Sequence, residues 1–78
     1  MLAAALEHLV RGIVDNPDEV KVVAVSGTRG EVLEVHVNPL DLGRVIGRSG
    51  RTAKALRTLV AALADGRRVR VDVVDTDN

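Results

Sequence analysis

The chain has 78 residues, of which 46% are hydrophobic, and it carries 11 acidic and 11 basic side chains, so its formal net charge is zero. It contains no cysteine, which excludes disulfides and thiolate sites, and no Phe, Tyr or Trp, which excludes the nucleic-acid-binding folds that stack bases on aromatic rings. The length predicts one small domain, and the lack of a long apolar run or a secretory signal predicts a cytoplasmic protein without a membrane partner.

The zero net charge conceals a strong segregation of charge along the chain. Residues 1–43 carry three basic and seven acidic side chains, residues 44–70 carry eight basic side chains and one acidic one, and residues 71–78 carry three acidic ones. A local anion-binding face produces this pattern, and so does a solvated helix. Charge alone leaves both interpretations open.

The first predicted element is a helix over residues 2–14. Apolar side chains fall there at intervals of four, three and four, which is the stripe of an amphipathic helix: Leu2, Leu6, Leu9 and Ile13. The dipeptide Asn16-Pro17 is expected to end this helix.

Two antiparallel strands are predicted next, over residues 20–25 and 31–37. Both are rich in valine, and the five residues between them include two glycines, as is typical of a hairpin turn. In the second strand Leu33, Val35 and Val37 alternate with polar residues. One face of that strand is therefore predicted to be buried and the other solvated.

A short helix of about two turns is predicted after the hairpin. Asn38 is expected to cap it, with Pro39 at the first helical position and Asp41 near the positive end of the helix dipole. Gly47 and Gly50 are expected to interrupt the helix, because two glycines three residues apart are poor helix formers.

A longer helix is predicted to begin at residue 51 or 52 and to stop at Asp65-Gly66. Its apolar stripe is expected to consist of Ala53, Leu56, Val60 and Leu63. A last strand over residues 69–73 follows, with Arg70 and Asp72 facing away from the core. The predicted order is α-β-β-α-α-β in one domain over residues 1–78, with a core over about 2–74 and a frayed tail at 75–78.

The segment GRVIGRSGRTAKALR, residues 43–57, holds three of the seven glycines and five basic side chains. As a helix, a turn and a second helix, it exposes the backbone at Gly47 and Gly50, and the second helix offers unpaired N–H groups at its start. Arg48 lies in the turn itself, and a basic ridge follows on the second helix: Arg51, Lys54 and Arg57. The segment is therefore predicted to bind the phosphates of a polyanion.

Two other nucleotide-binding motifs do not match this segment. A P-loop has four residues between its glycines and then Lys, whereas two residues separate Gly47 from Gly50 and Arg51 precedes Thr52. A dinucleotide fingerprint needs a glycine where Val45 stands, and it follows a strand.

The residues Val45-Ile46-Gly47-Arg48-Ser49-Gly50 resemble the signature of the KH domain, in which an apolar residue and Ile precede Gly-x-x-Gly between two short helices. The predicted element order resembles the bacterial, type II arrangement of that domain, and the size resembles the small single-domain proteins of the KhpA family. The resemblance implies an α+β fold, with three helices covering one face of a three-stranded sheet.

The resemblance also implies that a single strand of RNA, about four nucleotides long, lies in a groove with its backbone clamped by the turn. Hydrogen bonds and shape would take the place of aromatic stacking. Many relatives carry a Lys in the turn, whereas Arg48 is the one cation here. The RNA-binding residues implied by position are Gly43, Arg44, Ile46, Gly47, Arg48, Ser49, Gly50, Arg51, Lys54 and Arg57.

Other interpretations apply to some of these residues and their neighbours. Val45 and Ile46 are expected to pack into the core, so that any contact of Ile46 with a base is partial. Gly43 serves either the approach of a ligand or the tight packing of a helix on the sheet. Either solvation or an extension of the basic face accounts for three further arginines, Arg67, Arg68 and Arg70.

No catalytic or metal-binding pattern is found in the sequence. His8 and His36 are predicted to lie on separate faces, and Ser26 and Ser49 have no neighbouring base that would activate a hydroxyl. The chain is therefore expected not to be an enzyme and to need no metal, cofactor or small-molecule substrate.

The predicted function is that of an RNA chaperone or post-transcriptional regulator. The resemblance implies a homodimer, or a heterodimer with another KH-containing protein, which would join two short RNA sites into a longer one. The alternative is a protein-interaction adaptor, in which a helix or a sheet edge of the KH scaffold engages a partner protein.

Overall fold

The structure is a computed structural model that describes residues 2–74. The helices and strands are α1 (Leu2–Arg11), β1 (Lys21–Gly27), β2 (Gly30–His36), α2 (Leu42–Ile46), α3 (Arg51–Ala64) and β3 (Val69–Val73). Short 3₁₀ turns precede β1, α2 and α3, at Pro17–Glu19, Pro39–Asp41 and Arg48–Gly50. The predicted α-β-β-α-α-β order is confirmed. The frayed tail predicted at 75–78 lies outside the described residues.

The three strands form one mixed sheet in the order β1-β2-β3. β1 and β2 are antiparallel and joined by a tight hairpin, with Gly27 opposite Gly30 at its end. β2 and β3 are parallel, with Leu33 opposite Val71. A parallel pair needs a long crossover, which α2 and α3 provide here.

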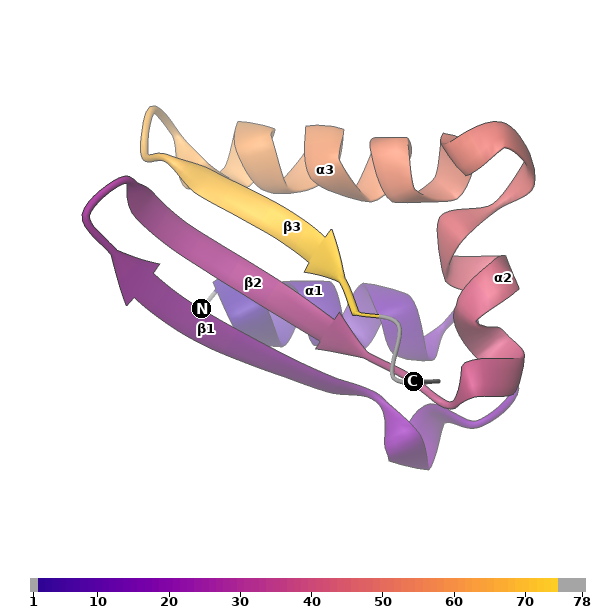
Figure 1. The fold of residues 1–78 in the computed structure, drawn as a ribbon. Helices are drawn as coiled ribbons and strands as arrows, with labels where there is room; N and C mark the ends of the chain where they lie inside the picture. The colour runs from indigo at the N-terminus through magenta and orange to yellow at the C-terminus, as the bar shows by residue number, and fades with distance from the viewer. Residues whose placement is uncertain (1, 75–78) are drawn as a thin grey trace.

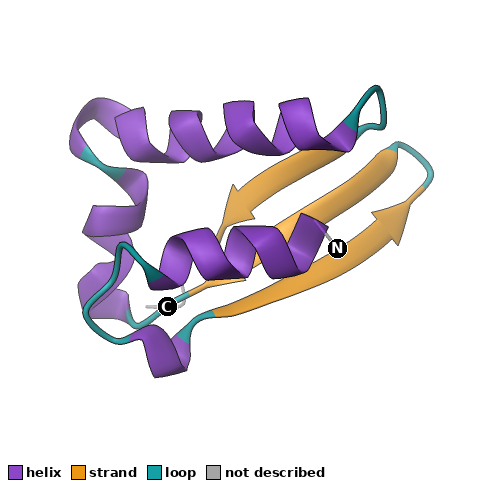
Figure 2. Cartoon of the chain, turned by 180° about the vertical axis from the view of Figure 1, so that it is seen from behind, coloured by secondary structure: helices purple, strands orange, loops and turns teal. Residues whose placement is uncertain are grey.

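The helices lie on one side of the sheet, as the type II KH arrangement implies. α1 packs on β1 and α3 on β3, while α2 packs against α3 at the end of the sheet (Figure 1). Seen from behind, α1 and α3 lie side by side over the strands (Figure 2). Within residues 2–74, the opposite face of the sheet carries no helix.

The core is formed entirely by aliphatic side chains between the helices and the sheet. Leu33 and Val35 of β2 are fully buried, and Val37, the residue after β2, is nearly so, which confirms the predicted inward face. Burial of each such side chain contributes about 1.5–3 kcal/mol. The buried cluster consists of Leu6, Val10, Val14, Val20, Leu33, Val35, Val37, Val45, Leu56, Val60 and Val71.

The first helix is shorter than predicted. α1 ends at Arg11, and the amide of Gly12 is shared between the carbonyls of His8 and Leu9, at 3.3 and 3.2 Å. Glycine is a poor helix former, and such shared bonds are common where a helix ends. The predicted stripe is also wrong at Leu9, which is 37% exposed, because Val10 continues the buried row from Leu6.

The longer helix α3 has the predicted start and differs at its end. Its buried residues are Ala53, Leu56, Val60 and Ala64. Leu63 was predicted to be buried and is 56% exposed. The buried row takes a second step of four there, as follows from 3.6 residues per turn. None of the helices in residues 2–74 has the length and apolar character needed to span a bilayer.

Candidate nucleic-acid interface

The turn at residues 47–50, called the GRSG turn from here on, separates α2 from α3. Gly47 has φ +78°, Ser49 has φ +57° and Gly50 has φ +74°, so the backbone leaves the helical region between Ile46 and Arg51. The amide of Gly50 donates to the carbonyl of Gly47 at 3.1 Å. The predicted interruption by the two glycines is therefore confirmed.

The glycines of this segment serve different purposes. A Cβ on Gly47 would lie 2.8 Å from the backbone nitrogen of Thr52, so only glycine fits there. A Cβ on Gly50 or Gly43 would have no atom within 4 Å, so these positions face open space. For Gly43 this contradicts the interpretation that it permits tight packing. That a ligand comes close to the backbone at Gly43 and Gly50 remains a prediction.

Three of the predicted cations extend freely into solvent. Arg48 in the turn and Arg51 and Lys54 on α3 are exposed, and their side chains form no ion pair or hydrogen bond with residues 2–74. Arg57 differs, because its Nε donates to the backbone oxygen of Val71 at 3.3 Å. This hydrogen bond connects the basic ridge of α3 to strand β3.

Arg44 is placed near the turn, but its charge is already paired. Its guanidinium lies 3.3 Å from a carboxylate oxygen of Asp15, which follows α1. Both side chains are more than half exposed, so such a pair contributes only about 0–1 kcal/mol. A phosphate group could therefore displace Asp15 from Arg44 at little cost.

Val45 and Ile46 were both predicted to enter the core, but only Val45 does so in the structure. Val45 is fully buried, whereas Ile46 is 39% exposed next to the GRSG turn. Consecutive residues of a helix point about 100° apart, and in the five-residue helix α2 the buried direction is that of Val45. The core prediction is wrong for Ile46, which lies on the surface that carries the other predicted site residues.

The sequence reasoning missed the structural role of Asp41. This residue was expected near the helix dipole, but it is only 1% exposed and accepts hydrogen bonds from the loop after α1. Its Oδ1 accepts from the amide of Asp15 at 3.2 Å, and its Oδ2 from the amide and the Nδ2 of Asn16 at 3.0 and 3.1 Å. Asp41 therefore anchors that loop beneath the start of α2. The Asn38 cap is as predicted, since its side chain accepts from the amide of Leu40 at 2.8 Å.

The ionisation of Asp41 follows from these contacts. Burial opposes the charged form, but the hydrogen bonds from Asn16 and from the backbone of Asp15, together with the nearby charge of Arg44, outweigh it and lower the pKa of Asp41 below its usual value. No local pattern in the sequence distinguishes this carboxylate from an ordinary acidic residue at a helix start.

A groove of about 420 Å³ lies between α3 and β3. Its lining brings together residues from two elements: Arg57, Ala61, Val69, Arg70, Val71 and Asp72. Small apolar side chains form part of its surface, and two arginines and one carboxylate supply hydrogen-bonding groups. The groove thus continues the surface of the basic ridge.

A second surface is apolar and lies between α1 and α3. The groove there has a volume of about 400 Å³. Leu9 and Leu59 line it, and they are 37% and 47% exposed. Leu63, one turn further along α3, is 56% exposed. Large aliphatic side chains clustered in this way are typical of a contact surface.

The predicted separation of the two histidines holds in the structure. His8 is exposed on α1, and His36 on β2 lies 3.6 Å from a carboxylate oxygen of Glu34. Among residues 2–74 no group of three potential metal ligands comes together.

Comparison with known proteins also identifies a KH domain, and the match extends over nearly the whole chain. Residues 3–74 match the family model for the KH domain of KhpA/KhpB. An RNA-binding protein KhpA of Leifsonia xyli subsp. xyli is 83% identical over 75 residues, which cover 96% of this chain and 99% of the relative. Proteins of the same name are 68% identical over 73 residues in Mycobacterium bovis, covering 94% and 90%, and 65% identical over 78 residues in Streptomyces coelicolor, covering 100% and 98%.

No solved structure matches the chain significantly. The family is nevertheless established by the match of residues 3–74 and by these identities. As the GRSG turn and the element order predicted, this chain belongs to the KhpA/KhpB family of KH-domain proteins.

Proposed function

We propose that this protein binds single-stranded RNA and holds the backbone of about four nucleotides at the GRSG turn. The observation that carries the proposal is the turn at 47–50, in which Gly47, Ser49 and Gly50 have positive φ. Its middle residues are exposed, and it lies directly before a helix with unpaired basic side chains. The relatives are named RNA-binding proteins, which supports RNA as the ligand and argues against an enzyme.

The phosphates would approach where the turn meets α3. Gly50 has no side chain and leaves open space, so a phosphate can come close to the backbone. The start of α3 presents the positive end of the helix dipole to the turn, which favours an anion there even though the amide of Arg51 already donates to the backbone oxygen of Arg48. Arg48 and Arg51 add full positive charges on either side of Gly50. Ser49 is exposed and supplies a hydroxyl.

The bases would lie along the groove between α3 and β3. Ala61 and Val69 offer small apolar contacts there, and Ile46 adds an exposed aliphatic side chain near the turn. Lys54 and Arg57, one turn apart on α3, would act as donors for base edges. A chain without aromatic rings holds bases by hydrogen bonds and shape, so we expect modest affinity and little sequence selectivity.

The test reverses the charge of the turn. We expect the double variant Arg48→Asp and Ser49→Asp to bind a short unstructured RNA about tenfold or more weakly, because two carboxylates replace a phosphate contact with repulsion. The measurement is a titration of fluorescently labelled RNA at two salt concentrations. A matched control, Ala4→Asp with Arg11→Asp on the exposed side of α1, also removes one arginine and adds two carboxylates.

Equal affinity of wild type and turn variant would remove the turn from the RNA site. Equal weakening in the turn variant and in the α1 control would mean that net charge, and not the turn, governs binding. Thermal unfolding of both variants checks that the fold is kept.

In the cell we propose a cytoplasmic RNA chaperone or post-transcriptional regulator that works as a dimer, either with itself or with another KH-containing chain. Two short RNA sites in one dimer raise the effective concentration of the second contact. The exposed Leu9, Leu59 and Leu63 offer an apolar surface for such pairing. Sedimentation analysis showing only monomers at every protein concentration, with and without RNA, would contradict self-association.

The same leucines favour one alternative, a protein-interaction adaptor. Salt separates the two functions, because binding through several phosphates weakens steeply as salt rises, whereas an apolar interface does not.

A further inference from the structure

Strand β1 forms one free edge of the sheet. The strand order is β1-β2-β3, and β1 pairs with β2 residue by residue, from Lys21–His36 to Gly27–Gly30, without a bulge. Among residues 2–74, no other strand pairs with the outer side of β1. Every second residue of an antiparallel edge strand directs its N–H and C=O groups away from the sheet, so β1 presents a row of unpaired backbone groups.

The β1 edge is also accessible and unprotected. Proteins usually protect an edge strand with proline, a bulge, charged side chains or a covering element. β1 has seven residues, and its one charged side chain is Lys21, at its first position. Ala24 pairs with the buried Leu33 and so points to the helix side of the sheet, yet it is exposed, as is Ser26. The helix α1 therefore does not overhang this edge.

The opposite edge, β3, differs from β1. It has five residues, and two of them, Arg70 and Asp72, are charged. Its Val71 oxygen accepts a hydrogen bond from Arg57, and it borders the groove that is proposed to hold the bases. β1 is therefore the edge that is open to a strand of a second protein chain.

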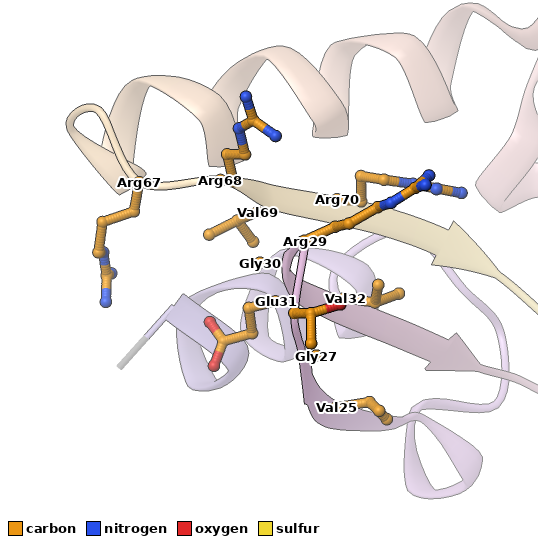
Figure 3. A pocket seen from close by; sticks show the side chains of 11 residues that line it. Val25, Gly27, Arg29, Gly30, Glu31, Val32, Arg67, Arg68, Val69 and Arg70 are labelled. Carbon is orange, nitrogen blue, oxygen red and sulfur yellow. The ribbon is translucent and has the colours of Figure 1, made fainter.

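Apolar side chains border the β1 edge on the helix-free face. Val23 and Val25 alternate with Ala24 and point to this face. Val25 is 45% exposed and is paired with Val32 of β2 (Figure 3). A strand added at this edge would cover these valines with its own side chains.

The residues of β1 are complementary to those of a second β1. Ala24 is the middle residue, so an antiparallel pairing centred on it joins all seven residues of both strands. Val23 then lies opposite Val25 of the second copy, and Lys21 lies opposite Gly27 of the second copy. The two lysines are at opposite ends of the pair, whereas a parallel pairing would bring these like charges side by side.

We propose that β1 pairs with the β1 of a second copy in this register and makes one continuous sheet, with the helices of both copies on the same face. The inference rests on the self-association in the proposed function and goes beyond it by naming the interface. The pairing leaves β3, and α3 that packs on it, at the two outer edges, so both proposed RNA surfaces stay open. The exposed leucines of α1 and α3 remain available to a different chain.

The experiment places a charge at the centre of the proposed pair. In Ala24→Lys two lysines would face each other, so we expect self-association about fivefold or more weaker than in wild type, and the same for Ala24→Asp. An equimolar mixture of the two variants should associate at least as tightly as wild type, because lysine then faces aspartate. Sedimentation equilibrium measures this, and thermal unfolding checks the fold. The control is Ala4→Lys, the same change of charge on the exposed side of α1.

Three results would overturn the proposal. One is a wild type that stays monomeric at every concentration, and another is a mixture that associates no better than either variant alone. The third is loss of association in Leu63→Glu with none in Ala24→Lys, which would assign self-association to the leucines. In wild type, alternate β1 amides should exchange more slowly with solvent at high protein concentration, and equal rates at all concentrations would also contradict the pairing.

RNA binding separates this inference from the proposed function. Both Ala24 variants should bind a tetranucleotide with wild-type affinity. If the turn itself does not bind RNA, the variant Arg48→Asp with Ser49→Asp keeps full affinity, and the self-association of the Ala24 variants is unaffected. If only the β1 interface is wrong, that turn variant loses affinity and Ala24→Lys associates as wild type does.

Discussion

The two ends of α3 both carry an arginine-rich surface, and they are built in different ways. At its start, the GRSG turn is one continuous stretch of chain whose spacing of glycines and arginines is visible in the sequence. At its far end, one groove is lined by Arg29 of the β1–β2 hairpin and by three arginines that follow α3, Arg67, Arg68 and Arg70 (Figure 3). The hairpin and the parallel β2–β3 pair place these segments next to one another. A local motif can thus be identified before folding, whereas an assembled one depends on strand register.

The two ends also differ in what holds them. Near the GRSG turn, the buried carboxylate of Asp41 binds the loop after α1. At the far end of α3, the amide of Glu31 donates to the backbone oxygen of Arg68 and holds the hairpin against the segment before β3. One anchor titrates with pH and the other does not.

The largest expected effect compares glycines at the two ends. Gly47→Ala and Gly30→Ala should each lower the free energy of unfolding by about 3 kcal/mol, because each adds a Cβ in close overlap with neighbouring atoms and at positive φ. Gly50→Ala should cost about 1 kcal/mol, since its Cβ meets open space and only the left-handed backbone is strained. Urea unfolding measures all three.

Equal losses for Gly47→Ala and Gly50→Ala would show that backbone strain alone matters at the turn. A Gly30→Ala loss as small as that of Gly50→Ala would show that the hairpin and the segment before β3 yield easily. That result would weaken the comparison of two rigid ends.

The next effect concerns pH. The lowered pKa of Asp41 means that its stabilising contribution is complete above the pKa of an unfolded aspartate, about 4, and is lost as pH falls through the lower folded value. We expect the amides of Asp15 and Asn16 to lose protection from hydrogen exchange below about pH 4, while the Glu31 amide stays protected.

Asp41→Asn supplies the matched control for this pH effect. The variant places an NH₂ group among donors that need an acceptor, so it should be less stable at neutral pH and should lose the acid-dependent step. NMR exchange rates measure both. A wild-type Glu31 amide that opens at the same pH as Asn16 would remove the distinction between the two anchors.

The smallest effect concerns Arg44. Asp15→Asn frees the guanidinium from its partner at 3.3 Å and removes a negative charge near the GRSG turn. An exposed pair contributes only about 0.2–1 kcal/mol, so RNA should bind about twofold more tightly at low salt. The same titration measures it. Weaker binding would place Arg44 outside the RNA path.

Much of the fold could be predicted from local sequence. The order of elements, the hairpin, the alternating face of Leu33, Val35 and Val37, the Asn38 cap and the GRSG turn all depend on residues within a few positions of one another. Periodicity, capping and glycine placement act at that range. They therefore predicted the order of helices and strands and the turn that the site is proposed to use, whereas the packing of three helices on one face of the sheet was implied by the resemblance to the KH domain.

Only the tertiary structure decided which side chains those elements bury or bring together. It placed Ile46 and Leu63 at the surface, buried Asp41 against the loop after α1, and set β3 parallel to β2, which places the arginines that follow α3 beside the hairpin. The physical reason is that burial and strand pairing depend on partners far away in the chain. A sequence pattern read locally contains the propensity of each segment but not the surface against which it packs.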